Sequence, residues 1–408
     1  MGFTVEHQCP QCGGGIDLDE TDHILRCPYC NVDNYLYPHN YLRFALPHKA
    51  PEKDIIYAPY LRFKGKVFYC QNLTLGHKVI DITSAGLPVK GLPASLGLRP
   101  QAMKMTIVSE KTPGSFLKFT LKASKLVAKA AALSSSSLKG KLYHRAYIGE
   151  TLSIIYLPLY IENGRIFDAV LNRPISDLSR EEDAFKENIT SKSSWKYDFI
   201  PTICPGCGWN LDAERDSVTL VCGNCDTAWE VLKGKFTEVD FMAVSGESGA
   251  DLYLPFWKIS AKTNGIKLGS YADFLRLTNQ PIVIDKSWET MEMNFWNPAF
   301  KIRPKTFLQV SKQLTVSQRF FKPDKKIPKK SLYPVTLPRT EAIQAMKIVL
   351  ANAAVNKKQV IPNLPDMTFE IDTSTLVYLP CTDTGHEVVV ENTGISINKR
   401  ALEFGRKL

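Results

Sequence analysis

The alternation of hydrophobic and polar positions predicts a chain built mainly from β-strands. Residues 154–161 and 252–257 are rich in aromatic and β-branched side chains, a composition that favours a pleated, half-buried strand. Both runs contain a Tyr-x-Pro triplet, and further triplets begin at Tyr57 and Tyr378. Because proline cannot donate to a sheet ladder, each triplet predicts an edge strand, a strand start or a bulge.

Turn-forming residues follow every Tyr-x-Pro triplet, so the pattern predicts four β-hairpins and a β-rich core. The expected turns are Lys64-Gly65-Lys66, Glu162-Asn163-Gly164, Thr263-Asn264-Gly265 and Asp383-Thr384-Gly385. The aromatic side chains of these strands could form a stacking platform for nucleobases, but packing in a core is their commoner role.

Two segments have the spacing of amphipathic helices. Residues 339–357 place Met346 and Leu350 on one apolar face, and Thr340 is available as an N-cap. Residues 121–133 have an apolar face as well, and their other face is basic. The basic side chains of that second helix are Lys122, Lys125 and Lys129.

Cysteines provide the most specific signal in the chain. Two Cys-x2-Cys pairs separated by fourteen residues occur twice, and the second set is the first displaced by 195 residues. Four thiolates satisfy a tetrahedral ion completely, so this spacing predicts two structural metal sites. The expected ligands are Cys9, Cys12, Cys27 and Cys30 in the first set, and Cys204, Cys207, Cys222 and Cys225 in the second.

The residue after the second cysteine of a Cys-x2-Cys knuckle tends to have a positive φ. In all four knuckles this residue is of a type that tolerates the left-handed backbone region. These residues are Gly13, Asn31, Gly208 and Asp226. Between the knuckles there is room for a short hairpin whose apolar residues can cover the metal. Those residues are Ile16, Leu25, Leu211 and Leu220.

The knuckles and their spacing resemble the rubredoxin-like zinc ribbon of transcription-factor-type proteins, over about a tenth of the chain at each site. The resemblance implies two bound Zn²⁺ ions. Disulfides and a rubredoxin-type iron centre are the alternatives, and knuckle spacing in an otherwise cysteine-poor chain favours zinc. The ribbons together with the Tyr-x-Pro hairpins also resemble uncharacterised bacterial zinc-ribbon proteins, a likeness that implies no activity.

Repeated features extend beyond the cysteines and indicate a tandem duplication. The offset between matching features grows along the chain, from 195 residues at the cysteines to 196 and then 222 at the two pairs of Tyr-x-Pro triplets. We therefore expect an α+β, β-rich fold of two modules, each a zinc ribbon followed by an antiparallel β domain with one or two helices. The expected domains are residues 1–40 and 198–235 for the ribbons, and 41–197 and 236–408 for the β domains.

Positive charge is concentrated in two segments. Residues 99–145 and 301–330 each contain ten Lys or Arg and one acidic residue, although the formal net charge of the whole chain is only +10. Such segments attract polyanions. The expected polyanion-binding residues are Lys122, Lys125, Lys129, Lys139 and Lys141 in the first segment, and Arg303, Lys305, Lys312, Lys325, Lys326, Lys329 and Lys330 in the second.

Three kinds of partner fit a basic ribbon protein. Nucleic acid is the first expectation, because zinc ribbons often accompany it. A protein complex that uses the chain as a scaffold is the second, and peripheral contact with an anionic membrane is the third. Lysine-rich loops can also serve solubility alone.

An enzyme is not expected, because the chain has none of the common phosphate-binding, dinucleotide-binding, metalloprotease or serine-hydrolase motifs. The cluster Cys381 to Glu387, which includes His386, is interpreted as a hairpin turn and not as a catalytic pair. The first residues lack the pattern of a signal peptide, and no apolar stretch is long enough to span a bilayer. We therefore expect a cytoplasmic protein in which Cys70 and Cys381 are free thiols.

Overall fold

The computed structural model describes residues 4–50, 52–87, 89, 91–126, 128, 140–177, 187–190, 195, 197–246, 250–319, 321 and 323–406. The chain forms two compact units, each assembled from three stretches of sequence. Unit 1 comprises Met1–Lys64, Ile80–Leu133 and Glu150–Thr202, and unit 2 comprises Gly65–Val79, Ser134–Gly149 and Ile203–Leu408. The domain boundaries expected at residues 40, 197 and 235 stay a prediction.

Strands dominate the first half of the chain, in agreement with the predicted β-rich α+β class. They are β1 (Thr4–Gln8), β2 (Gly15–Asp19), β3 (Ile24–Arg26), β4 (Asp33–Pro38), β5 (Leu42–Ala45), β6 (Ile56–Gln71), β7 (Thr74–Ala85), β8 (Met105–Ile107), β9 (Ser115–Leu117), β10 (Leu142–Glu162), β11 (Arg165–Asp168), β12 (Arg173–Asp177), β13 (Ile189–Thr190) and β14 (Tyr197–Pro201), with a short helix α1 (Arg99–Ala102).

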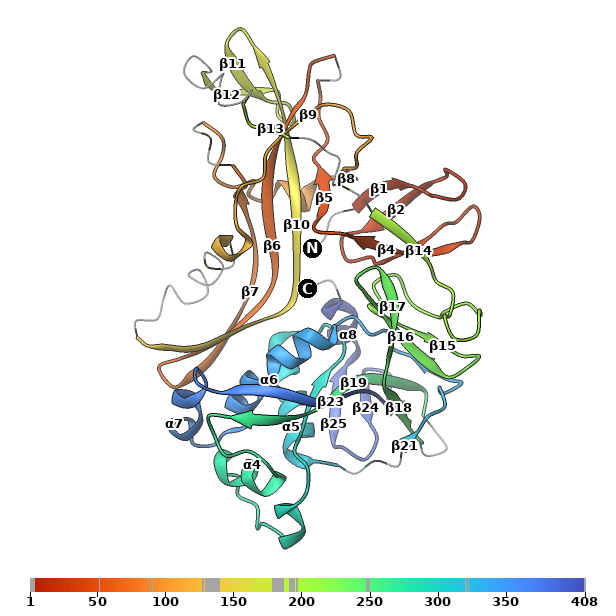
Figure 1. Ribbon diagram of the computed structural model, residues 1–408, viewed down its shortest axis with the longest axis vertical. Helices are drawn as coiled ribbons and strands as arrows, with labels where there is room; N and C mark the ends of the chain where they lie inside the picture. Colours follow the sequence, from red (N-terminus) through yellow and green to blue (C-terminus); the bar gives the residue numbers. More distant parts are fainter. Residues whose placement is uncertain are drawn as a thin grey trace. The chain divides into compact units, whose positions relative to one another are not determined.

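Within the described part of the chain, eleven of these strands form one sheet whose main path is β13-β9-β6-β10-β5-β8-β1-β2. Strands β7, β11 and β12 extend it beside β6 and β10. Figure 1 shows β6, β7 and β10 as long strands that run side by side. The remaining strands form a small sheet in the order β14-β4-β3.

Unit 2 combines strands with most of the helices. Its further strands are β15 (Thr219–Cys222), β16 (Thr227–Leu232), β17 (Lys235–Val239), β18 (Phe241–Val244), β19 (Leu252–Asn264), β20 (Asn294–Pro298), β21 (Pro323–Asp324), β22 (Ser331–Leu332), β23 (Thr368–Asp383), β24 (Glu387–Val390) and β25 (Ile395–Asn398). Its helices are α4 (Tyr271–Thr278), η1 (Lys286–Glu289), α5 (Pro304–Ser317), α6 (Arg339–Ala353), α7 (Lys357–Val360), η2 (Ile361–Asn363) and α8 (Lys399–Gly405).

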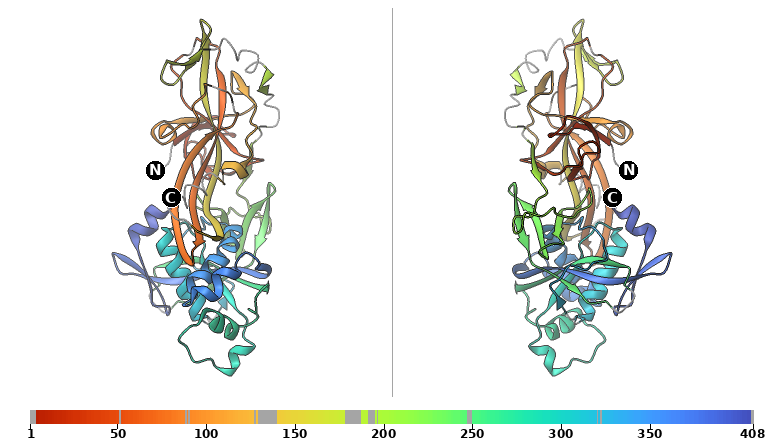
Figure 2. Two further views of the ribbon diagram at one scale, coloured as in Figure 1. Left: turned by 90° about the vertical axis from the view of Figure 1, so that its left-hand side faces the viewer. Right: turned by 90° about the vertical axis from the view of Figure 1, so that its right-hand side faces the viewer.

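The sheets of unit 2 have the main path β20-β19-β23-β18-β21 and the three-stranded order β15-β16-β17. Helices α5 and α6 contact each other, α5 contacts β20, and α6 contacts β19 and β20. Both views of Figure 2 show these helices lying beside the strands of this unit.

The main sheets of the two units share one pairing scheme. Strand β5 pairs parallel with β10 and antiparallel with β8, as β18 does with β23 and β21. Strands β6 and β19 each run parallel to a short strand, β9 and β22 respectively. The registers agree as well. Ala45 of β5 faces Tyr156 of β10 and Thr106 of β8. In the same way, Ala243 of β18 faces Tyr378 of β23 and Asp324 of β21.

Each Tyr-x-Pro triplet lies in a long strand with neighbours on both sides, so the edge-strand alternative is wrong; β19, for example, lies between β20 and β23. Two triplets fit the strand-start alternative, because Tyr57 and Tyr253 are the second residues of β6 and β19. Each proline lies where a neighbouring strand ends, and its carbonyl oxygen accepts a hydrogen bond from the residue directly after the last residue of that neighbouring strand. A missing N–H is tolerated there because one ladder has ended. The pairs are Gly86 with Pro59 (2.7 Å), Ala169 with Pro158 (3.0 Å), Ala299 with Pro255 (3.0 Å) and Glu391 with Pro380 (2.9 Å).

Two of the four expected turns are confirmed. Asn163 and Gly164 have positive φ values between the paired strands β10 and β11, and the turn at Gly385 joins β23 to β24. The turn expected at residues 64–66 is wrong, since β6 continues through it to a turn at Asn72 and Leu73, where φ is 49° and 62°. The turn expected at residues 263–265 is also wrong, because β19 pairs there with β23 and the chain continues to α4.

The predicted helix at residues 339–357 is confirmed as α6, with Met346 and Leu350 fully buried. It begins after Pro338 and ends at Ala353, so the expected cap at Thr340 is wrong. In the basic segment, residues 123–126 and 128 are helical, and the rest of the helix predicted there lies outside the described residues.

The hydrophobic core of unit 2 includes residues from the first half of the chain. Phe68 and Cys70 of β6 and Ala146 and Ile148 of β10 are buried in the same cluster as the strands and helices of residues 203–402. The ring of Phe68 lies 5.9 Å from that of Phe307 in α5. Unit 2 therefore depends on side chains that precede its ribbon by more than fifty residues, and in the case of Phe68 and Cys70 by more than a hundred.

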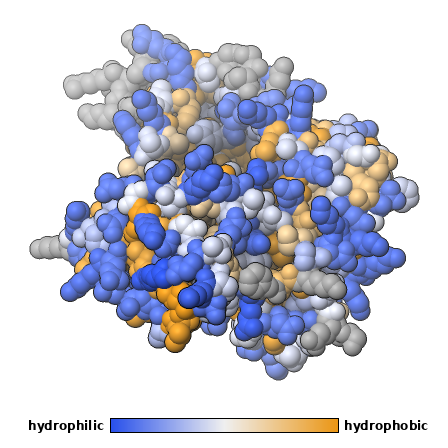
Figure 3. Space-filling view, turned by 60° about the horizontal axis from the view of Figure 1, so that its bottom comes forward, coloured by the Kyte–Doolittle hydropathy of each residue, from blue (hydrophilic) through white to orange (hydrophobic). Residues whose placement is uncertain are grey.

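The surface face in Figure 3 is largely hydrophilic, and its hydrophobic residues gather in a narrow strip and smaller patches. In the part of the chain that the structure describes, no helix combines the length and the apolar character needed to cross a membrane.

We expect Phe68→Ala to lower the free energy of unfolding by about 3–5 kcal/mol, because it removes a fully buried ring and leaves a cavity. Urea unfolding followed by circular dichroism measures this change. The control is Leu98→Ala, which removes a side chain that is 74% exposed and should change stability by less than about 0.5 kcal/mol. Equal stability of the two variants would contradict the burial of Phe68 in this core.

Candidate metal centres

The eight cysteines expected as ligands form two clusters. Ribbon 1 (residues 8–38, unit 1) holds Cys9 after β1 and Cys12, with Cys27 and Cys30 between β3 and β4. In each cluster all four sulfur atoms lie within 4.8 Å of one another. Ribbon 2 (residues 203–239, unit 2) holds the second cluster, which ends where β16 begins.

Sulfur separations fit a tetrahedral ion. A metal–sulfur bond of about 2.3 Å places tetrahedral sulfurs about 3.8 Å apart. The measured pairs are Cys9–Cys30 at 3.7 Å and Cys12–Cys27 at 3.5 Å in ribbon 1, and Cys204–Cys225 at 3.6 Å and Cys207–Cys222 at 3.5 Å in ribbon 2. A disulfide would need about 2.0 Å, and all ten cysteines are free. Both clusters are compatible with one bound metal ion each, and four thiolates leave no position for a reacting water.

The backbone of the knuckles has the predicted conformation. Residues Gly13, Asn31, Gly208 and Asp226 have φ of 74°, 56°, 75° and 53° respectively, so the expectation of left-handed residues is confirmed. The turn closes with hydrogen bonds such as those from the Gly13 and Gly208 N–H groups to the carbonyls of Cys9 and Cys204, each 2.9 Å. The apolar residues expected to cover the sites, Ile16, Leu25, Leu211 and Leu220, are all buried.

Backbone amides also favour the thiolate form that a metal requires. Burial opposes ionisation of Cys204, but the N–H groups of Cys207 and Gly206 outweigh it and lower the pKa of Cys204 to about 6. The same balance of burial against the N–H groups of Cys30 and Tyr29 lowers the pKa of Cys27 to about 6. In the same clusters, burial and the neighbouring cysteine sulfurs raise the pKa of Cys30 and of Cys225 to about 12.

Ribbon 2 has a hydrogen-bond chain to its sulfurs that ribbon 1 lacks. Indole Nε1 of Trp229 donates to the Thr227 hydroxyl at 2.8 Å, and that hydroxyl lies 3.2 Å from the Cys225 sulfur. A metal-bound thiolate has no proton, so the hydroxyl would donate to it. The positions 195 residues earlier are Val32 and Asn34, and the side chain of Val32 has no hydroxyl, so only its backbone N–H contacts the Cys30 sulfur. The cysteine spacing gave no sign of this difference.

The tips of the ribbons each carry one exposed aromatic ring, but from opposite knuckles. In ribbon 1 it is Tyr29, 70% exposed, whose ring lies so close to Gly14 that a Cβ there would be 2.5 Å from it. In ribbon 2 it is Trp209, 62% exposed, at the position 195 residues after Gly14, and the position matching Tyr29 is Asn224. Ribbon 1 has Gly14 and Tyr29 where ribbon 2 has Trp209 and Asn224, so the aromatic residue lies on the first knuckle in ribbon 2 and on the second knuckle in ribbon 1.

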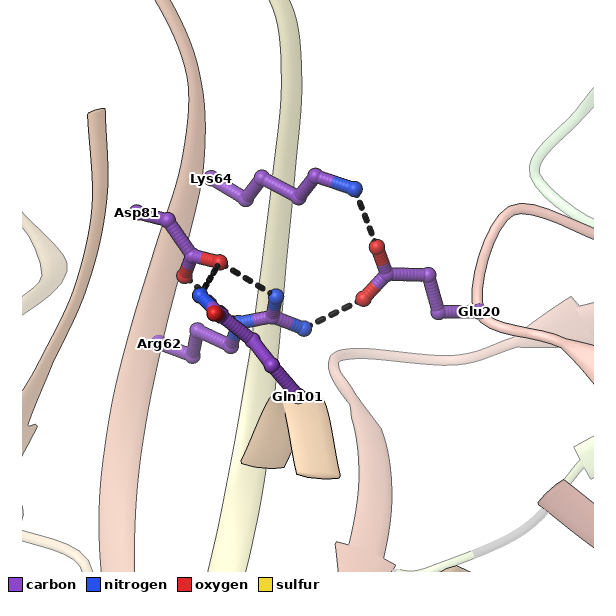
Figure 4. A network of polar contacts seen from close by, with 5 residues as sticks. All are labelled: Glu20, Arg62, Lys64, Asp81 and Gln101. Atoms are coloured by element: carbon purple, nitrogen blue, oxygen red, sulfur yellow. Dashed lines mark hydrogen bonds and ion pairs between the residues drawn. The ribbon is translucent and has the colours of Figure 1, made fainter. Parts of the chain in front are cut away.

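A buried ion network joins ribbon 1 to the large sheet of unit 1 (Figure 4). Glu20, directly after β2, forms ion pairs with Arg62 and Lys64 of β6, and all three side chains are at least 92% buried. Arg62 also donates to Asp81 of β7 at 2.7 and 2.8 Å, and Gln101 donates to the same carboxylate at 2.6 Å. Removing one partner from a buried pair typically costs about 3–5 kcal/mol, so this network fixes the ribbon to the sheet.

The expected polyanion-binding residues fall into separate places. Among those the structure describes, Lys312 is half-buried in α5 and the others are exposed; Lys129 and Lys139 lie outside the described residues. Lys122 and Lys125 belong to unit 1, whereas Lys141 belongs to unit 2. One compact group forms in unit 2, the basic loop of residues 325–330, which contains Lys325, Lys326, Lys329 and Lys330.

The basic loop is attached to ribbon 2. The Ile327 N–H donates to Asp226 Oδ1 at 2.8 Å, and Asp226 directly follows the metal-ligand candidate Cys225. At the base of the loop, Asp324 of β21 pairs with β18 and accepts a hydrogen bond from the Lys326 N–H at 3.0 Å. The four lysines are therefore held beside the second cluster.

The cluster at Cys381 has the geometry of a strand end. Cys381 lies in β23 and is fully buried, and burial raises the pKa of its thiol to about 12. Asp383 forms an ion pair with Lys399 and accepts a hydrogen bond from the Gly385 N–H at 2.7 Å. The hairpin interpretation of this segment is confirmed.

The geometry thus defines a β-rich α+β protein with two closed four-cysteine sites of zinc-ribbon-like form. No protein-family model, curated protein or solved structure matches the chain.

We expect Cys204→Ser to reduce the metal content from two ions per chain to one, because a serine hydroxyl is a poor replacement for a thiolate ligand. Elemental analysis of the purified protein measures the stoichiometry. Cys70→Ala is the matched control, since Cys70 lies outside both clusters, and it should retain both ions. Two ions in the Cys204 variant would refute the second site.

Thr227→Val should weaken metal binding in ribbon 2 by about 10-fold or more, because an isosteric methyl group replaces the hydroxyl beside Cys225 and outer hydrogen bonds tune metal affinity. Competition with a chromogenic chelator gives the affinity of each site. Thr237→Val, at an exposed position of β17, is the control. An unchanged affinity in the Thr227 variant would show that the hydroxyl does not act on the sulfurs.

Proposed function

We propose that this is a non-enzymatic zinc-ribbon protein that binds nucleic acid through ribbon 2 and its basic loop. The observation that carries the proposal is the hydrogen bond from Ile327 to Asp226, because it holds four exposed lysines against a metal-stabilised knuckle. Phosphates are the natural partners of such a fixed group of cations, since each contact releases counterions from the nucleic acid.

Zinc is the proposed metal in both ribbons. Support comes from the four-sulfur geometry, the hydrophobic cover and the free state of every cysteine, which together suit a structural ion. An iron centre with the same ligands would absorb visible light, so a colourless protein with two equivalents of zinc is the expected result of the elemental analysis.

We further propose that the two modules arose by duplication. The shared strand pairing, the equal registers and the four proline carbonyl contacts support it, because unrelated sheets would not agree in direction and register at so many strands. In this proposal the positions of the two basic segments correspond, but their local structures have diverged. The loop of residues 107–112, which corresponds to the basic loop, contains one acid, Glu110, and one lysine, Lys111.

Reversing the charge of the basic loop, by Lys→Glu at residues 325, 326, 329 and 330, should abolish binding to a labelled oligonucleotide without unfolding the protein. Anisotropy titrations at several salt concentrations measure this, and the wild-type slope of log affinity against log salt should be about −0.7 for each phosphate neutralised on a single strand.

The matched control reverses four exposed lysines of unit 2 outside the ribbon and its loop, Lys262, Lys267, Lys286 and Lys358, and should bind like the wild type. Binding that survives in the loop variant would refute the proposal. Wild-type protein that ignores oligonucleotides, and instead sediments with vesicles rich in phosphatidylglycerol or retains a protein partner, would replace nucleic acid with a membrane or a scaffold role.

A further inference from the structure

The exposure of Trp209 is unusual within this chain. Of the six tryptophans, four are at most 9% exposed and Trp288 is half-buried, but Trp209 is 62% exposed. An indole ring that is exposed to water does not gain the stabilisation that burial would give. A function at the surface would explain why this ring lies at the tip of ribbon 2. A single exposed apolar residue would need no explanation by itself; Trp209 differs because it lies on a hydrogen-bonded knuckle of the cluster to which the basic loop is attached.

The backbone around Trp209 is held rigidly. Its carbonyl accepts a hydrogen bond from the Cys204 N–H at 2.7 Å, and the preceding Gly208 donates to the Cys204 carbonyl at 2.9 Å. Cys204 and Cys207 belong to the second cluster, so a bound ion fixes this knuckle further. Little additional ordering is then needed when a flat ligand stacks on the ring.

Trp209 and the basic loop flank the same four sulfurs. Trp209 follows Cys207 by two residues, and the loop is attached through Asp226, which follows Cys225 by one. The four sulfurs lie within 4.8 Å of one another, so the two knuckles that carry Trp209 and Asp226 are adjacent in unit 2. An aromatic ring beside fixed cations matches a base and its flanking phosphates.

Resting on the proposed function, we infer that ribbon 2 binds single-stranded nucleic acid, with a nucleobase stacked on Trp209 and the adjacent phosphates on the lysines of the basic loop. A duplex cannot use this ring, because the faces of its bases are already stacked on one another. Ribbon 1 has the ring of Tyr29, but the loop of residues 107–112 gives it no lysine group, so it does not form a second site of this kind.

Fluorescence anisotropy with labelled oligo-dT and oligo-rU of about a dozen nucleotides tests the inference, with a duplex of matched length alongside. Trp209→Ala should weaken single-strand binding by about 5- to 100-fold, the range expected for the loss of one stacked base, and should leave duplex binding unchanged. Trp209→Phe should restore most of the affinity, because its ring can still stack. Tyr29→Ala is the matched control at the other tip and should bind like the wild type.

The outcomes separate this inference from the function on which it rests. If Trp209→Ala, with both metal ions still bound, matches the wild type on single strands, or loses single-strand and duplex binding equally, the stacking inference is wrong. The proposed function then still stands, provided that charge reversal of the basic loop abolishes binding. If charge reversal leaves binding intact, the proposed function fails whatever the result for Trp209.

Discussion

The convergence of four sulfur atoms on one point is the constraint on which each ribbon depends. A segment of some thirty residues is too short to build a stable core of its own, so its shape must come from a metal and from its attachments. The sulfurs fix the position of the left-handed residues that follow the knuckles, and those residues fix the position of the neighbouring side chains. In ribbon 2 the knuckles carry Trp209 and Asp226, and through Asp226 they position the basic loop. In ribbon 1, Glu20 adds an attachment to the large sheet by entering a buried ion network.

Local chemistry decided which features could be predicted from the sequence. The cysteine spacing, the left-handed residues after each knuckle and the turn at Asn163-Gly164 depend only on neighbouring residues, and the structure agrees with all of them. The turn predicted at Lys64-Gly65-Lys66 is wrong. Charged residues beside a glycine usually indicate a solvated turn, but Lys64 pairs with Glu20, which lies 44 residues away in the sequence. The contact between Asp226 and the basic loop spans 101 residues and left no local signal.

The two sheets follow one pairing scheme but are stabilised by different interactions. In β6 the buried positions include Arg62 and Lys64, whose charges are matched by carboxylates, whereas β19 buries Phe256 and Trp257 against helices. Buried ion pairs contribute little net stability once desolvation is counted, but they tolerate few alternative arrangements. Unit 1 therefore adds charge matching around Glu20 to its apolar core, whereas the core of unit 2 packs between α5, α6 and its sheet.

The composition of unit 2 has a consequence for how the chain acquires its structure during synthesis. Gly65–Val79 and Ser134–Gly149 leave the ribosome early, yet the last strand of their unit, β25, ends about 250 residues after Gly149. At about 5–20 residues per second, their apolar side chains wait on the order of tens of seconds for a partner surface. During that interval the ends of β6 and β10 are exposed strands, the kind of surface that chaperones bind and that aggregates when left uncovered.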